Sequence, residues 1–184
     1  MRILFLLLAV PVLLSVSTAQ QYTNWQNYTA LKNVSDITII DDGFWSSSTG
    51  GTFKYANNSN DFNTLHKSDG LEGNSFTTVT TDKYGRIWFG SIEGIIDIYD
   101  EPVNSFDVIL DILSSNQINK RINDLTSSGD TMIVSTDFGV SLIDVDSFLF
   151  FDTFFKFGSF PTNTSVNSTL KTELFYKYFR QDTL

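Results

Sequence analysis

Few residues of this 184-residue sequence have the types and the spacing that catalysis requires. Cysteine does not occur, which excludes thiol catalysis, disulfides and cysteine-based zinc sites. Histidine occurs once, at His66, and such a side chain can serve as a general base. No nucleophile stands at a suitable spacing from it, so a structural histidine is the favoured interpretation. We therefore expect no enzymatic activity, no cofactor and no metal ion.

Acidic residues beside predicted turns are the second candidates for chemistry, namely Asp41, Asp42, Asp82 and Asp130. Paired carboxylates can bind Ca²⁺ or hydrolyse glycosidic bonds. Aspartate beside glycine in a β-turn more often accepts hydrogen bonds from its own backbone. The EF-hand spacing is absent, so we interpret these residues as turn formers.

Small residues form a run from Ser46 to Thr49, followed by Gly50 and Gly51, as in some phosphate-binding loops. The run lacks the Gly-Lys-Ser/Thr ending and the following helix that such a loop needs. We interpret it as a strand and a hairpin turn.

Aromatic side chains could contact a glycan, because sugar rings stack on aromatic faces. The candidates are Trp25, Tyr28, Phe44, Tyr84 and Phe138. Packing inside the fold is the favoured alternative, since aromatic residues contribute most of the buried area in many cores.

The elements that position these residues are clearest from Phe76 to Asp100. Three short runs rich in β-branched and aromatic residues, Phe76–Thr81, Arg86–Ser91 and Ile95–Tyr99, alternate with turn residues. This pattern is typical of an antiparallel meander.

The same pattern recurs on both sides of this stretch. Trp45, Trp88 and Ile133 form a column with spacings of 43 and 45 residues, and six residues after them stand Gly51, Gly94 and Gly139. A period in the forties with several short strands indicates a β-propeller, whose blades bury their faces against one another. We interpret the column as structural residues and not as a site.

The sequence therefore predicts an all-β fold, a partial β-propeller of about three four-stranded antiparallel blades. The blades are expected at residues 34–66, 76–112 and 122–155, with outer strands at Phe62–His66, Phe106–Ile112 and Phe148–Phe155. Propellers close with about four to eight blades, so three and a fraction cannot close a ring. We expect that the chain either belongs to a longer protein, which is favoured, or associates with itself through open blade faces.

Residues 1–19 are predicted to be a signal peptide. Arg2 supplies the positive charge, Ile3–Val16 the apolar stretch and Ser17–Ala19 the small-residue cleavage site. The apolar stretch is short for a membrane span and is interrupted by Pro11. An exported protein that does not span the membrane is expected, with an uncleaved anchor as the alternative.

The mature chain is expected to divide into the partial propeller at 20–168 and a tail at 169–184. The tail lacks the glycine and tryptophan columns of the repeat. The segment from Trp25 to Tyr28 occupies the place of an outer strand ahead of the first blade. A net charge of −9 argues against binding to nucleic acid.

Two family resemblances follow from these motifs. Asp69-Gly70-Leu71, followed by Gly85-Arg86-Ile87-Trp88-Phe89-Gly90, resembles the two-component regulator propeller repeat. That repeat occurs in periplasmic sensor regions of hybrid histidine kinases. The resemblance implies a propeller that senses a glycan.

A closer resemblance links blades two and three to PorZ-type propeller proteins. It is carried by Gly94–Tyr99, Asp111-Ile112, Lys120–Leu125, Ser135–Asp144, Phe157-Gly158 and Val166-Asn167, and is expected to end near Asn167. The resemblance implies a non-catalytic component of the type IX secretion system. Its implied partners are other secretion-complex proteins or lipopolysaccharide, at the periplasm or outer surface of a Gram-negative bacterium.

Overall fold

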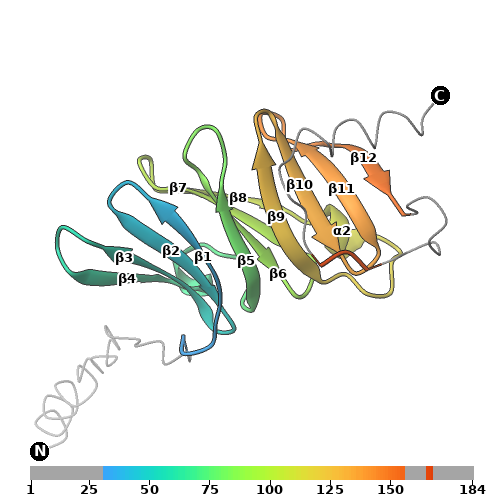
Figure 1. Ribbon diagram of the computed structural model, residues 1–184. Helices are drawn as coiled ribbons and strands as arrows, with labels where there is room; N and C mark the ends of the chain where they lie inside the picture. The colour runs from blue at the N-terminus through green and yellow to red at the C-terminus, as the bar shows by residue number, and fades with distance from the viewer. Residues whose placement is uncertain (1–30, 156–164, 168–184) are drawn as a thin grey trace, which may run out of the picture.

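Three antiparallel sheets of four strands stand side by side in the computed structural model, which describes residues 31–155 and 165–167 (Figure 1). In each sheet the strands follow one another in chain order. Blade one contains β1 (Val34–Ile40), β2 (Gly43–Ser48), β3 (Gly51–Ala56) and β4 (Asp61–Leu65). Blade two contains β5 (Phe76–Thr81), β6 (Ile87–Ser91), β7 (Ile96–Asp100) and β8 (Ser105–Ile109). Blade three contains β9 (Ile122–Ser128), β10 (Thr131–Thr136), β11 (Gly139–Asp144) and β12 (Phe150–Phe154).

This arrangement confirms the predicted all-β fold class of a partial β-propeller with three four-stranded blades. The predicted signal peptide at 1–19, the predicted tail at 169–184 and the candidate residues Trp25 and Tyr28 lie outside the described residues.

The prediction that the outer strand of blade two reaches Ile112 is wrong. Strand β8 ends at Ile109, and a single helical turn, α2 (Asp111–Ser114), follows it. The amide of Ser114 donates to the carbonyl of Leu110 over 2.8 Å. Because the chain turns here, Ile109 and Ile112 are both buried in the same apolar cluster. A short 3-10 helix, η1 (Lys67–Asp69), similarly follows β4.

Glycine is required where the chain turns between the central strands of a blade. Gly51 at the start of β3 has φ +134°, and a Cβ there would meet the carbonyl oxygen of Leu65 at 2.8 Å. Gly94 in the β6–β7 turn has φ +86°, and a Cβ there would meet the carbonyl of Lys120 at 2.8 Å. Gly139 begins β11 with φ +149°. These residues bring neighbouring backbone closer than any side chain would allow.

Two apolar clusters fill the seams between the blades. Between blades one and two, Trp45 packs edge-on against Phe89 and Tyr99, with ring centroids 5.8 and 5.7 Å apart. Between blades two and three, Trp88 is surrounded mainly by aliphatic side chains such as Ile98 and Val134. Both tryptophans are fully buried, so each seam is centred on one of the repeat's column residues. Ile133, the third column residue, is buried on the far side of blade three.

The innermost strands β1, β5 and β9 are joined across both seams by side chains. Asp36 Oδ2 on β1 accepts hydrogen bonds from the Val79 amide and the Thr78 hydroxyl of β5, each at 3.0 Å. The Thr78 hydroxyl in turn accepts from the amide of Leu125 on β9 at 3.3 Å. A continuous chain of polar contacts thus holds the three inner strands together.

The described residues 165–167 lie against blade three. Asn123 Nδ2 donates to the carbonyl of Val166 at 2.9 Å, and the Val166 amide donates to the carbonyl of Thr136 at 2.9 Å. One blade earlier, the Thr77 hydroxyl lies 2.5 Å from the carbonyl oxygen of Ile122. Val166 therefore has the same type of contact with blade three that Ile122 has with blade two.

Candidate functional site at the turns between blades two and three

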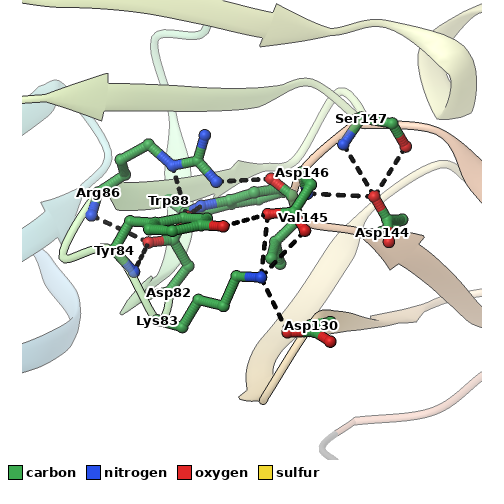
Figure 2. Close-up of polar contacts among 10 residues, drawn as sticks. All are labelled: Asp82, Lys83, Tyr84, Arg86, Trp88, Asp130, Asp144, Val145, Asp146 and Ser147. Atoms are coloured by element: carbon green, nitrogen blue, oxygen red, sulfur yellow. Dashed lines mark hydrogen bonds and ion pairs between the residues drawn. The ribbon is translucent and has the colours of Figure 1, made fainter.

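A cluster of polar contacts lies where turns of blades two and three meet (Figure 2). It combines the β5–β6 turn, the β9–β10 turn and the β11–β12 turn. The residues involved are Asp82, Lys83, Tyr84, Arg86, Trp88, Asp130, Asp144, Val145, Asp146 and Ser147.

Asp82 organises the β5–β6 turn. Its carbonyl accepts from the Gly85 amide at 3.1 Å, and Gly85 has φ +81°, which favours glycine. Its side chain is wholly buried, and Oδ1 accepts from the amides of Tyr84 at 2.8 Å and Arg86 at 3.1 Å. Oδ2 accepts from Arg86 Nε at 2.6 Å and from Trp88 Nε1 at 2.9 Å. A carboxylate with four donors is well compensated for its burial.

Arg86 connects this turn to blade three. Its Nη2 donates to the carbonyl of Val145 at 2.5 Å. Its guanidinium carbon also lies 4.8 Å from the ring centroid of Phe148, which packs edge-on against Trp88 at 5.6 Å. The ion pair with Asp82 fixes Arg86 on blade two, and the hydrogen bond from Nη2 to Val145 holds the β11–β12 turn.

Lys83 and Tyr84 make a second, more exposed connection. Lys83 Nζ pairs with Asp130 Oδ1 at 2.8 Å and with Asp146 at 3.0 Å, and the Tyr84 hydroxyl donates to Asp146 Oδ1 at 2.6 Å. The hydrogen bond to Asp130 is the main reason that the pKa of Lys83 lies above its ordinary value. The hydrogen bond from Tyr84, followed by that from Lys83, lowers the pKa of Asp146.

Asp144 closes the β11–β12 turn in the same cluster. Its Oδ1 accepts from the amide and the hydroxyl of Ser147, both at 2.8 Å. These bonds lower the pKa of Asp144, the one from the Ser147 amide most of all. This carboxylate therefore serves the turn itself.

The geometry of Tyr84 bears on its predicted role in stacking on a sugar. Lys83 Nζ lies 4.6 Å and the Arg86 guanidinium carbon 5.0 Å from the ring centroid. The ring lies between these two side chains in Figure 2. Tyr84 is 61% exposed, but a sugar stacked on its ring would compete with two cations that lie within 5.0 Å of the ring centroid. The cluster therefore has the properties of a clasp between blades rather than of an open ligand platform.

The other predicted candidates lie elsewhere and do not converge. Phe44 is half-buried on the side of blade one that faces away from blade two, and Phe138 is buried in the cluster of blades two and three. His66 is buried, with its ring nitrogen 3.3 Å from the carbonyl of Gly50. Within the described ranges no three His, Cys, Asp or Glu side chains are grouped to hold a metal ion.

The sequence analysis did not predict a group of three charged side chains at the seam of blades one and two. Lys54 Nζ on β3 contacts Asp42 Oδ2 in its own blade and Glu101 Oε1 in blade two, both at 2.8 Å. Burial alone would lower the pKa of Lys54, but the hydrogen bonds to Asp42 and Glu101 outweigh it and raise the pKa. The same bond lowers the pKa of Asp42. One feature of the repeat could have revealed the triplet. Lys54 pairs with Trp45 as Ile98 pairs with Trp88, so blade one has a charged residue where blade two has an apolar one.

Asp97 on β7 is a buried carboxylate of blade two. Its two oxygens accept from the amides of Glu72 at 2.7 Å and Gly73 at 2.8 Å. Burial raises the pKa of Asp97 above its ordinary value, against the effect of these two bonds. The residue ties the loop between blades one and two to blade two, so its role is structural.

Stacked four-stranded blades with a buried residue at each seam define this chain as a β-propeller. It belongs to the family described as "TSS9, PorZ, N-terminal beta-propeller domain", which matches residues 44–183. The match passes Asn167, so the expectation that the likeness ends there is wrong. The comparison with curated protein sequences gave no match.

Several solved structures share the fold. PorZ of Porphyromonas gingivalis, described as an essential bacterial surface component of the type-IX secretion system, is 17% identical with a TM-score of 0.65. That alignment covers 71% of this chain and 18% of PorZ. The extracellular domain of BT4673 from B. thetaiotaomicron, described as a hybrid two component system, is 19% identical with a TM-score of 0.57. It is covered over 17% of its length, and this chain over 72%. The chain thus spans less than a fifth of either relative.

The neighbours named above are extracellular or surface proteins. Within residues 31–155 and 165–167, no helix has the length and apolar character to cross a membrane.

Proposed function

We propose that the chain is part of an exported, non-enzymatic propeller module that serves type IX secretion and attachment at the cell surface. The observation that carries this proposal is the family match over residues 44–183. The module would act by binding other proteins of the secretion complex or lipopolysaccharide, and the resemblance to PorZ supports both.

The use of charged side chains supports a binding and scaffold role. The buried carboxylate of Asp82 is engaged with Arg86 and Trp88, and the cation of Lys54 with carboxylates of two blades. A catalytic acid or base has to reach a substrate, whereas these groups hold blades together. The predicted signal peptide at 1–19 supports export.

A deletion in the native host tests the secretion role. The gene that encodes the full-length protein is removed, and type IX cargo is quantified on the cell surface and in the periplasm. We expect cargo to leave the surface and to return when the gene is restored. Normal surface attachment in the deletion strain would rule out the proposed role.

Lipopolysaccharide binding is tested separately by calorimetric titration of the full-length protein with purified lipopolysaccharide. We expect saturable binding that weakens when the polysaccharide is removed from the lipid. Absence of binding by protein that circular dichroism shows to be folded would contradict this part of the proposal. The secretion role would then rest on protein partners alone.

Glycan sensing for a hybrid histidine kinase is the second candidate, because the extracellular domain of BT4673 shares the fold. The two candidates differ in what the intact gene encodes. A second propeller and a β-sandwich after Leu184 support the secretion role, whereas a membrane helix and a kinase support sensing.

A further inference from the structure

Every blade has two ends, which we name by the backbone that lies there. The turn end holds the turns that join the first strand to the second and the third to the fourth, such as β5–β6 and β7–β8. The loop end holds the turns between the second and third strands, together with the connectors from one blade to the next. Blades stack through the faces of their sheets, so both ends stay outside the stacking however many blades complete a ring.

The turn end is strongly acidic. Its cations are Lys54, Lys83 and Arg86, and each of them is already bound to a carboxylate of the same end. Asp41, Asp61, Asp100 and Asp144 add further negative charge there. This end would therefore be repelled by an anionic surface.

The loop end is nearly balanced in charge. The remaining lysines and arginines of the described ranges lie there, namely Lys32, Lys67, Lys120 and Arg121. The carboxylates beside them are Asp69, Glu72, Glu93, Asp111 and Asp137. Charges farther away than about 8 Å are largely screened at physiological salt. Of the two ends, only the loop end can approach an anionic surface without strong repulsion.

Three aliphatic side chains are exposed at this loop end, on the β6–β7 turn and on the connector between blades two and three. Ile118 is 97% exposed, Ile92 40% and Leu113 37%. The Leu113 amide donates to the carbonyl of Gly94 at 3.2 Å, which ties α2 to the β6–β7 turn. Lys120 Nζ donates to the carbonyl of Leu113 at 2.5 Å, which ties the rest of the connector to α2. We call Ile92, Leu113 and Ile118 the apolar tips.

The apolar tips and their neighbouring cations together suit a lipid surface. An aliphatic side chain that is almost fully in water gains free energy when it enters the boundary between head groups and acyl chains. Lys120 and Arg121 follow Ile118 by two and three residues. Cations in such positions can remain at the level of the lipid phosphates while the apolar side chain inserts. A protein partner would need a separate pocket for each tip, whereas a fluid bilayer adapts to all three.

We propose that the loop end of blades two and three docks on an anionic lipid surface, with Ile118 inserted and the acidic turn end directed away from the lipid. The inference rests on the proposed attachment at the cell surface and names the part of the chain that contacts lipid. The apolar tips supply the affinity, and the charge difference between the two ends sets the orientation.

Co-sedimentation of the full-length protein with vesicles of phosphatidylcholine and a minority of phosphatidylglycerol tests the proposal. We expect the wild type to bind and Ile118→Asp to bind at least about tenfold more weakly, because a carboxylate replaces the inserting side chain. Val103→Asp is the matched control, since Val103 is 67% exposed in the β7–β8 turn, at the turn end. It should bind as the wild type does. Arg121→Gln should lose about fivefold on these vesicles and nothing on pure phosphatidylcholine.

A second measurement follows the inserting position itself. Ile118→Cys and Val103→Cys are labelled with a polarity-sensitive dye, and wild type taken through the same labelling gives the background. We expect the vesicles to shift the dye emission to the blue for Ile118→Cys and not for Val103→Cys.

Wild-type protein that is folded by circular dichroism and stays in the supernatant would overturn the proposal. So would equal losses of binding for Ile118→Asp and Val103→Asp, or a blue shift at both labelled positions. The vesicles contain neither lipopolysaccharide nor secretion proteins, so these outcomes are independent of those that test the proposed function.

Discussion

The two seams of this propeller hold the same kind of blades together by different means. The seam of blades one and two is rich in aromatic rings and contains a buried ammonium, that of Lys54, between carboxylates of both blades. The seam of blades two and three is mainly aliphatic around Trp88, and its ionic contacts lie at the turns. The comparison shows that the repeat dictates a large column residue but leaves the placement of charge open.

The column tryptophans show the same contrast. The indole N–H of Trp88 donates to Asp82, whereas that of Trp45 is buried and has no hydrogen-bond partner in the described structure. A buried donor without an acceptor costs free energy that a bonded donor does not. Seam two–three should therefore depend on its polar contacts more than seam one–two does.

Replacing Asp82 by alanine should give the largest effect. It removes a buried carboxylate and leaves Arg86 Nε and Trp88 Nε1 without the acceptor that Asp82 provides. We expect the free energy of unfolding to fall by about 3–5 kcal/mol, as for other broken buried pairs. Urea unfolding followed by circular dichroism measures it, with Asp130→Ala, an exposed partner of Lys83, as the control. A loss below about 1 kcal/mol would contradict the role assigned to Asp82.

Substituting phenylalanine for each tryptophan tests directly whether the indole hydrogen bond distinguishes the two seams. Trp88→Phe and Trp45→Phe remove similar ring volume, but only Trp88→Phe leaves Asp82 with one donor fewer. We expect Trp88→Phe to cost about 1–2 kcal/mol more than Trp45→Phe in the free energy of unfolding. Denaturant titration of both variants provides the measurement. Equal costs would show that the indole hydrogen bond is not what distinguishes the seams.

Lys54→Met should have a smaller effect of about 1 kcal/mol, because its two carboxylate partners are partly exposed and can be hydrated. The control is Lys67→Met, an exposed lysine 3.8 Å from Glu72, which should change nothing measurable. If both variants lose the same stability, the buried position of Lys54 is irrelevant.

The pKa shifts of Lys54 and Asp42 also predict how the stability difference between the wild type and Lys54→Met depends on pH. The pKa of Lys54 is raised above 10.5 in the folded protein, so its contribution is complete below pH 10.5 and is lost as pH rises through the folded pKa. The pKa of Asp42 is lowered below 3.8, so its contribution is present above pH 3.8 and is lost as pH falls through the folded pKa. Wild type and Lys54→Met should therefore converge in stability at both extremes. A difference that is constant with pH would contradict the pairing.

Lys83→Met should have the smallest effect. The lysine and its partners Asp130 and Asp146 are accessible to water, where ion pairs contribute little and are screened by salt. We expect the unfolding midpoint to be indistinguishable from that of the wild type at high salt. A midpoint shift that persists at high salt would contradict this expectation and show that the ion pairs of Lys83 stabilise the seam of blades two and three.

The sequence predicted the blades because their signals are local. Alternating strands, turn glycines such as Gly94 and the spacing of Trp45 and Trp88 can be recognised without knowing which residues meet in space. The end of β8 was missed, since Ile109 and Ile112 suit a strand as well as a helical turn. Only packing against blade three selects the turn.

The polar contacts between blades could be predicted only in part. Asp82 was expected to serve its own turn and does so, but its bond to Trp88 depends on how the strand after the turn is placed. The contact of Lys54 with Glu101 joins residues 47 positions apart in different sheets, and no local pattern records such a pairing. The same holds for Tyr84, whose ring is approached by Lys83 and Arg86 only once the turn has formed.

The hydrogen bonds between the inner strands have a direction along the chain. In each seam the later strand donates a backbone amide, of Val79 or Leu125, to a side chain that was synthesised earlier, on Asp36 or Thr78. Because the chain emerges with its N-terminus first, the acceptor for each new blade is already present when that blade emerges. Each blade can be recruited by the one before it, so the order of synthesis is also an order of assembly.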